Sequence, residues 1–239
     1  MDHLERAKQL FFEALTLQGK GDLEHAARRY VKALTLAPEH PNVMNNLAAV
    51  YIGLNRHAKA KLLCERLLKI NPQDESALLN LGICQVKLGS PQEALALYGR
   101  ALEVRPDNVA VLNNLGSALL KLERPQEALA SCDRALAVEP DIAEALHNRA
   151  KALRELKRPQ EALVSFERAL EIRPGFFDAL LGLGNALWDL GRYQEAADGY
   201  EKALAISRAL ISSFESGPND IAVISNRVLS CASNNPAIK

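Results

Sequence analysis

The chain has 239 residues, of which 48% are hydrophobic, so it can bury a substantial core. Its 29 acidic and 29 basic residues give a net charge of zero, which argues against the basic domain that nucleic-acid binding normally requires. The four cysteines form no C-x-x-C pair. Because the N-terminus carries no secretory signal and no apolar run reaches membrane-spanning length, we expect a cytoplasmic protein that binds neither nucleic acid nor membrane.

The most informative feature is an internal repeat with a period of 34 residues. The stretch RPQEALASCDRALAVEPD, which begins at Arg124, recurs as RPQEALVSFERALEIRPG from Arg158. Prolines follow the same period, at Pro38, Pro72, Pro106, Pro140 and Pro174. They define a short extension, residues 1–6, followed by six repeats: 7–40, 41–74, 75–108, 109–142, 143–176 and 177–210.

Each repeat has the apolar spacing of two amphipathic helices, a helix A and a helix B. In the turn KLGSPQEA of the third repeat, Gly89 suits the end of helix A, Ser90 can cap helix B, and Pro91 fits its first turn. Small residues such as Gly82 and Ala94 recur at positions 8 and 20 of the repeat and let the two helices pack closely. Because one pair cannot cover its own apolar face, we predict an all-α solenoid of stacked pairs.

This pattern resembles the tetratricopeptide repeat family over residues 7–210, through the period, the small residues and the closing proline. The resemblance implies a right-handed α-solenoid of six helix-turn-helix repeats. Some positions depart from the family. Glu13 and Arg149 stand where leucine is usual, Gln85 replaces a large apolar residue, and Arg208 replaces the sixth closing proline.

Residues 211–239 break the period. We expect them to contain an extension of the last helix B, a capping helix over PNDIAVISNRVLSCAS, and a frayed end. The capping helix is predicted because the segment has the pattern of another helix A, and such stacks need a polar cover on their last repeat. The alternative is a disordered tail.

Nothing in the sequence indicates catalysis, a cofactor or a metal site. The five histidines are scattered, and none forms a pair at metal-ligand spacing beside a carboxylate. The stretch GLGNAL at Gly182 lacks the third glycine and the preceding strand of a dinucleotide-binding loop, so we interpret it as helix packing. Cys64 and Cys132 stand where other repeats have Tyr or Phe, which predicts small buried hydrophobic residues. We therefore predict a protein that is not an enzyme.

The resemblance implies that helix-A positions 2, 5, 6, 9, 12 and 13 line a concave surface. Asparagines repeat there, with Asn46, Asn80, Asn114 and Asn148 at position 6, Asn45 and Asn113 at position 5, and Asn185 at position 9. An asparagine amide both donates and accepts, so a ladder of them can hold a peptide backbone. Protein O-GlcNAc transferases carry such a ladder in their repeats. Here the ladder ends at Phe12 and Gly182, which occupy position 6 in the first and last repeats.

The rest of this predicted groove has two parts. Toward the N-terminus it is apolar and includes Phe11 and Phe12, and toward the C-terminus it carries Lys151, Arg154 and Trp188. Arg154 and Trp188 share position 12 in adjacent repeats and are predicted to stack as a cation–π pair. This favours a ligand with an apolar segment and an acidic or aromatic one, and the alternative is a solvated mixed face. The Lys, Asn and Arg pattern with which some relatives clamp chaperone tails is not present.

Three functions remain open. The leading hypothesis is a scaffold that binds a peptide or helix segment of another protein in the concave groove. The second is a substrate-recruiting repeat arm of an O-GlcNAc transferase-like glycosyltransferase system. The third is self-assembly through the ends of the stack.

Overall fold

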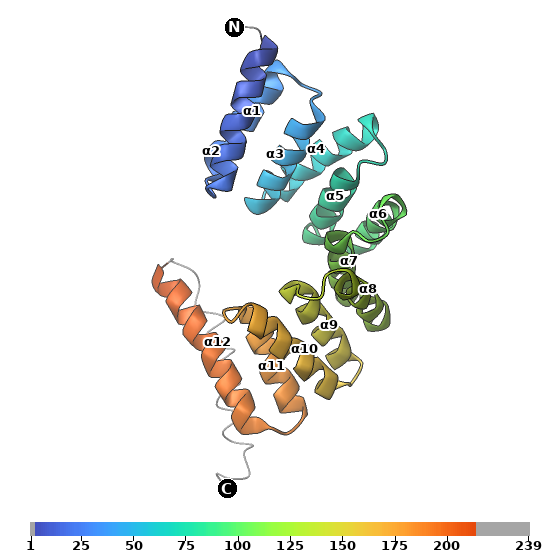
Figure 1. Ribbon diagram of the computed structural model, residues 1–239, viewed down its shortest axis with the longest axis vertical. Coiled ribbons are helices and arrows are strands. Elements are labelled where there is room, and N and C mark those ends of the chain that lie inside the picture. Colours follow the sequence, from blue (N-terminus) through green and yellow to red (C-terminus); the bar gives the residue numbers. More distant parts are fainter. Residues whose placement is uncertain (1–2, 214–239) are drawn as a thin grey trace. The chain divides into compact units, whose positions relative to one another are not determined.

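Residues 3–213, which the computed structural model describes, form twelve helices and no strand. Helix A of the successive repeats is α1 (His3–Gly19), α3 (Pro41–Gly53), α5 (Glu75–Lys87), α7 (Val109–Lys121), α9 (Ala143–Glu155) and α11 (Phe177–Asp189). Helix B is α2 (Leu23–Leu36), α4 (His57–Ile70), α6 (Pro91–Val104), α8 (Pro125–Val138), α10 (Pro159–Ile172) and α12 (Tyr193–Ser213). The predicted all-α fold of repeated helix pairs is confirmed (Figure 1).

Two compact units make up the chain, Met1–Ala118 and Leu119–Lys239, and their boundary falls inside α7. In the N-terminal unit each helix from α1 to α6 packs on the next one along the chain, and in the C-terminal unit the same holds from α8 to α12. Helix A of one repeat also contacts helix A of the next, as α3 does with α5 and α9 with α11. This stacking covers the apolar faces that a single pair leaves open.

The core of a repeat forms where a side chain of helix B packs on a small residue of helix A. Tyr98 and Tyr200 are almost completely buried. A Cβ atom added to Gly82 would lie 2.3 Å from Cε1 of Tyr98, and one added to Gly184 would lie 2.5 Å from Cε1 of Tyr200. The expectation that small residues allow close packing of helices A and B is therefore confirmed at these two positions.

The turn from helix A to helix B has the same conformation in all six repeats. One residue in each turn has a positive φ: Gly21, Asn55, Gly89, Glu123, Lys157 and Gly191, spaced 34 residues apart. The residue that follows donates its N–H to a carbonyl five residues back, as Ser90 does to Gln85 (2.8 Å) and Arg124 to Leu119 (3.0 Å). This is the Schellman arrangement, which satisfies the last carbonyls of a helix. The role predicted for Gly89 is confirmed.

The cap predicted from Ser90 is only partly correct. Ser90 is the N-cap residue of α6 and Pro91 follows it, but the serine side chain makes no capping hydrogen bond. The backbone of Ser90 is at φ −115° and ψ 60°. In contrast, the carboxylates of Asp22 and Asp74 accept from the backbone N–H groups of His25 and Ala77.

The repeated segment that begins Arg-Pro-Gln-Glu forms a local ion pair between its arginine and its glutamate. Arg124 donates through Nε and Nη2 to the two carboxylate oxygens of Glu127, both at 2.7 Å, and Arg158 pairs in the same way with Glu161. These hydrogen bonds lower the pKa of both glutamates. Because the pairs are exposed, they contribute little to stability.

The last helix, α12, runs without interruption to Ser213 and has 21 residues, compared with 14 in α10. The predicted capping helix and frayed end lie outside the described residues. Among residues 3–213 no helix combines the length and the apolar character that crossing a membrane requires.

The positive φ of Glu123 and Lys157 yields a first prediction. A residue with a Cβ atom is disfavoured in this conformation, so Glu123→Gly and Lys157→Gly should each raise the free energy of unfolding, by up to about 1 kcal/mol. The reverse change Gly89→Ala should lower it by about 1 kcal/mol, because open space surrounds Gly89 and only its φ of 89° is unfavourable. Urea denaturation of the full chain measures all three, and destabilisation by either glycine substitution would contradict the prediction.

Candidate functional site

Two of the predicted asparagine rungs are held in place by their own helix. Nδ2 of Asn46 donates to the backbone oxygen of Asn42 at 2.8 Å, and Nδ2 of Asn114 donates to that of Ala110 at 2.8 Å. Each amide nitrogen has a second hydrogen, and each Oδ1 can accept two hydrogen bonds. The back-bond thus fixes the orientation of the amide and leaves it able to both donate and accept.

Asn80 stands at the same repeat position on α5, between these two rungs, and is half-buried. Because α3 contacts α5, Asn46 and Asn80 lie on stacked helices in equivalent positions. The N-terminal unit therefore carries three rungs, Asn46, Asn80 and Asn114, and Asn148 belongs to the C-terminal unit.

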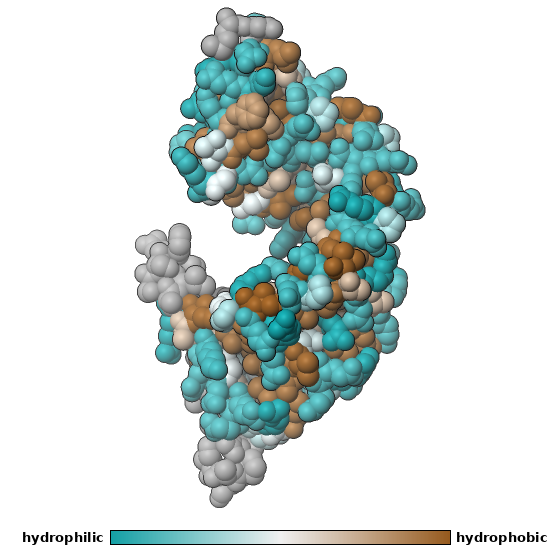
Figure 2. Space-filling view, viewed as in Figure 1, coloured by the Kyte–Doolittle hydropathy of each residue, from teal (hydrophilic) through white to brown (hydrophobic). Residues whose placement is uncertain are grey.

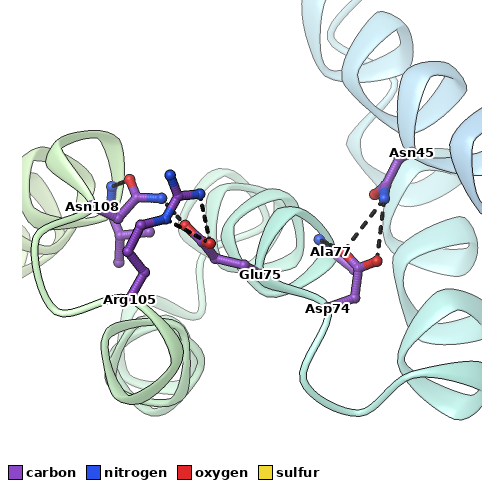
Figure 3. Close-up of polar contacts among 7 residues, drawn as sticks. Asn45, Asp74, Glu75, Ala77, Arg105 and Asn108 are labelled. Carbon is purple, nitrogen blue, oxygen red and sulfur yellow. Dashed lines mark hydrogen bonds and ion pairs between the residues drawn. The ribbon is translucent and has the colours of Figure 1, made fainter.

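Asn45 has a structural role instead. Its Nδ2 donates to the carboxylate of Asp74 at 3.4 and 3.5 Å, and its Oδ1 is buried without a hydrogen bond within the described part of the chain. Asp74 is itself the N-cap residue of α5 and accepts from the N–H of Ala77 at 2.8 Å. Asn45 thus connects α3 to the start of the next helix A (Figure 3).

A second polar junction follows, which sequence reasoning missed. Glu75 of α5 accepts from Nε and Nη2 of Arg105 at 2.8 and 2.6 Å and from Nδ2 of Asn108 (Figure 3). Asn108 also caps α7 by accepting from the N–H of Val111 at 3.0 Å. This network ties the closing loop of the third repeat to the helices on either side of it.

The remaining predicted asparagines are half-buried in their repeats. Asn185 of α11 accepts at Oδ1 from the hydroxyl of Tyr200 at 2.9 Å, so it fixes the buried tyrosine of the same repeat. Asn113 and Asn148 also make polar contacts within the chain. Asn185 is therefore part of the packing between α11 and α12.

The ladder ends at Gly182 for a steric reason. A Cβ atom at this position would lie 2.3 Å from Cε1 of Phe166, the buried helix-B residue of the preceding repeat. The interpretation of GLGNAL as helix packing is confirmed, because Gly182 and Gly184 each face an aromatic ring.

Phe11 and Phe12 separate into two environments. Phe11 is partly buried against the core and lies 5.9 Å from the ring of Tyr30 and 6.3 Å from that of His40, measured between ring centroids. Phe12 is 55% exposed and contacts Phe11 edge-on at 5.7 Å. Of this pair, Phe12 is therefore the more exposed residue.

The predicted stacking of Arg154 on Trp188 is wrong. Nε of Arg154 instead donates to Oδ2 of Asp189 at 2.6 Å, and Trp188 packs edge-on against Tyr193 with ring centroids 5.0 Å apart. The carboxylate one residue beyond Trp188 competes better for the guanidinium than the ring does, because it carries a full charge. Lys151 is exposed.

Three polar residues that stand at usually apolar repeat positions form ion pairs or hydrogen bonds. Glu13 pairs with Arg29 at 3.3 Å, and Nε2 of Gln85 donates to Glu93 at 2.5 Å. Arg149 donates to both Asp133 and Ser165 at 2.6 Å. These pairs satisfy polar groups that would otherwise be costly near the core.

Burial makes the described cysteines unreactive. Cys64, Cys84 and Cys132 are free and buried, which confirms the prediction for Cys64 and Cys132. Burial raises the pKa of Cys84 to about 11 and that of Cys132 to about 12, and it raises the pKa of Cys64 further. Within residues 3–213 no cluster of His, Cys, Asp and Glu has the arrangement of a metal site.

These features define a helical-repeat protein whose helix-A face presents amides. Models of the tetratricopeptide repeat (TPR) match residues 17–82, 76–108, 107–174 and 147–210. Together the matches span most of the chain, which belongs to the TPR family.

Solved structures share the fold. A thermophilic TPR protein of Thermus thermophilus is 23% identical with a TM-score of 0.65, covering 76% of this chain and 99% of that one. MamA from Desulfovibrio magneticus RS-1 is 19% identical with a TM-score of 0.61, covering 71% and 96%. YrrB, described as a TPR protein with an unusual peptide-binding site, is 25% identical with a TM-score of 0.55, covering 72% and 88%. Comparison with curated protein sequences gave no match.

The contact at Gly182 predicts that any larger side chain at this position destabilises the fold. Gly182→Ala should lower the free energy of unfolding by about 1–3 kcal/mol, because the added methyl group overlaps the Phe166 ring. Gly99→Ala is the matched control, because Gly99 lies on helix α6 with open space around it. This change should raise the free energy of unfolding by up to about 1 kcal/mol, since alanine has a higher helix propensity than glycine. Equal stabilities of the two variants in urea denaturation would show that the Gly182 contact is not tight.

His147 predicts a pH dependence of the C-terminal unit. Burial lowers the pKa of His147 from the usual 6.5 to about 4, with a smaller contribution from Lys151, whereas Asp178 and Glu144 oppose the shift. Its ring lies 5.7 and 5.1 Å from those of Phe166 and Phe176. Between pH 6.5 and 4 the unfolded chain binds a proton that the folded chain does not, so stability falls as the pH is lowered through this window.

The loss should total roughly 3 kcal/mol for a shift of this size. Urea denaturation at several pH values measures it, and His147→Leu should remove this part of the pH dependence. The difference between the two proteins isolates His147 from carboxylates that titrate nearby. Parallel pH profiles of wild type and variant would contradict the prediction.

Proposed function

We propose that this chain is a non-enzymatic scaffold that binds an extended peptide or helix segment of another protein on its helix-A face. The observation that carries the proposal is the pair of amides at Asn46 and Asn114, each fixed by a 2.8 Å bond to its own helix. Membership of the TPR family and the likeness to YrrB, a TPR protein with a peptide-binding site, support it.

Preorganisation is the proposed mechanism. A free asparagine side chain loses rotamer entropy when it binds a peptide, whereas Asn46 and Asn114 have already lost it on folding. Each rung can then accept a peptide N–H and donate to a peptide C=O. Because the backbone is the same in every peptide, such rungs provide affinity without strict sequence preference.

Selectivity would come from the side chains at the ends of the ladder. Phe12, which is exposed in the N-terminal unit, offers an apolar contact. In the C-terminal unit, exposed Lys151 offers a positive charge, whereas Arg154 is already paired with Asp189. We infer that the N-terminal unit prefers an apolar segment of the ligand, and that an acidic residue is recognised through Lys151.

The same rungs would serve a substrate-recruiting arm of an O-GlcNAc transferase-like system, since that role also requires sequence-tolerant peptide binding. The identity of the captured partner separates the two roles, because a glycosyltransferase subunit would favour the second. Self-assembly through the stack ends predicts a mass that rises with concentration in light scattering.

The test compares three full-length proteins. The first is wild type, the second carries Asn46→Ala, Asn80→Ala and Asn114→Ala, and the control carries Gln92→Ala, Gln126→Ala and Gln160→Ala. The control removes three exposed amides that repeat at the same period on helix B. Partners captured from native extract are identified by mass spectrometry, and their peptides are titrated by fluorescence anisotropy.

We expect wild type and control to bind equally and the asparagine variant to bind more weakly, since each lost hydrogen bond contributes about 0.5–1.5 kcal/mol. Circular dichroism confirms that all three proteins fold. Equal binding by the asparagine variant would remove the ladder from the mechanism and move the site to another face.

A further inference from the structure

At two positions on the outer surface of helix B, large hydrophobic residues occur in only some repeats. Repeat position 25 is occupied by Val31, Glu65, Gly99, Asp133, Glu167 and Glu201. Position 22 is occupied by Arg28, Leu62, Ala96, Ala130, Val164 and Asp198. Val31 is 42% exposed and Leu62 is 62% exposed, so two large apolar side chains reach the surface of neighbouring helices at positions that are mostly polar or small elsewhere.

These two side chains border one hollow of about 620 Å³ in the N-terminal unit, which we call the α2–α4 groove. Its apolar wall continues inward through Leu34 of α2, Leu63 of α4 and Tyr51 of α3. The volume is in the range of sites that hold small ligands or the side chains of a bound segment. In the view of Figure 2, hydrophobic residues come to the surface of this unit among hydrophilic ones.

The rim of the groove is basic. Lys59, Arg66 and Lys69 line it together with a single acidic residue, Glu65. Lys59 and Lys69 form no ion pair with any residue that the structure describes. Nζ of Lys59 lies 5.8 Å from the centroid of the Tyr51 ring, at the edge of the apolar wall.

A second hollow of about 640 Å³ adjoins the first, since Val31 and Tyr51 line both. Four further basic residues line it, with Glu24 as its one carboxylate: Arg28, Arg29, Lys32 and Arg56. Arg56 pairs with Glu24 at 2.6 Å and Arg29 with Glu13 at 3.3 Å, and the remaining basic residues leave this surface with an excess of positive charge. An apolar stripe with a basic rim is complementary to an apolar stripe with acidic flanks.

We propose that the α2–α4 groove is a second binding surface, which takes an acidic amphipathic helix of another protein. Val31 and Leu62 receive its apolar face, and the lysines and arginines of the rim pair with carboxylates on either side of that face. The chain's own residues 211–239 carry two acidic and two basic residues, so they lack the complementary charge. The surface is formed mainly by α2 and α4, and its lining contains none of the asparagine rungs of helix A.

The test selects ligands without bias. A displayed library of random peptides of about 16 residues, long enough for four helical turns, is panned on the full chain. We expect enriched peptides to be acidic, with apolar residues at a helical period. A synthetic representative, titrated by fluorescence anisotropy, should bind wild type and lose at least about tenfold in affinity with Leu62→Glu, which opposes both the apolar contact and the charge.

The matched control is Val164→Glu, which makes the same kind of change at repeat position 22 in the C-terminal unit, where Val164 is 64% exposed. It should leave binding unchanged. The double variant Lys59→Glu and Lys69→Glu should weaken binding as Leu62→Glu does, and added salt should weaken the wild type. The asparagine triple variant should bind the peptide normally, which separates this surface from the proposed function.

Three outcomes would overturn the proposal. The first is enrichment of peptides that are not acidic, or whose binding is insensitive to Leu62→Glu. The second is failure of the peptides to bind while vesicles of phosphatidylcholine and phosphatidylglycerol bind through the same residues, which would assign the groove to a membrane surface. The third is a dimer in sedimentation analysis that Leu62→Glu dissolves, which would assign it to a second copy of the chain.

Discussion

The close approach of helix A and helix B at a small residue is the contact on which the rest of this structure depends. Where the rings of Tyr98 and Tyr200 press on Gly82 and Gly184, no room remains for even one additional carbon atom. This contact fixes the rotation of each helix within its pair. The helical period then decides which side chains point outward. Asn80 and Asn185 stand in the repeats of these two glycines, whereas in the first two repeats, which carry Val31, Asn46 and Leu62, the same position holds the buried small residues Ala14 and Ala48.

Because the repeats share one packing pattern, residues that depart from this pattern are informative. Most variation between repeats preserves a contact by other means, as when Gln85 pairs with Glu93 or Arg149 with Asp133 and Ser165. Val31 and Leu62 behave differently, because their apolar side chains remain exposed among the residues that the structure describes. A departure that costs solvation and brings no internal contact is the kind that a binding partner explains.

The fold could be predicted from the sequence because individual residue types recur every 34 residues. Prolines, the small residues at position 8 and the turn glycines each mark a backbone constraint that few other residues satisfy. The site was harder to predict. The pattern placed Asn45 and Asn46 side by side, but only the structure shows that Asn45 reaches Asp74 whereas Asn46 bonds within its own helix.

The one prediction that chose a partner for a side chain, the stacking of Arg154 on Trp188, failed, and other contacts of arginines were not predicted at all. The next repeat offers Arg154 two partners, the ring of Trp188 and the carboxylate of Asp189. The spacing of residues in the sequence does not show which of the two partners binds more strongly. Contacts such as that of Arg66 with the carbonyl of Pro38 at 3.0 Å, and that of Arg100 with the carbonyl of Pro72, were missed although position 26 is basic in every repeat. The partners of these arginines are backbone atoms, which leave no mark in the sequence.

The buried thiols can report local unfolding of the protein. Cys64 and Cys84 lie in the N-terminal unit and Cys132 in the C-terminal one, and all three are inaccessible in the folded state. A thiol reagent can reach them only when the surrounding helices separate, so the labelling rate of each cysteine follows the local unfolding equilibrium of its own repeat. In a stack held together by nearest neighbours, the natural sequence thus already carries a probe for how far fraying spreads from one repeat to the next.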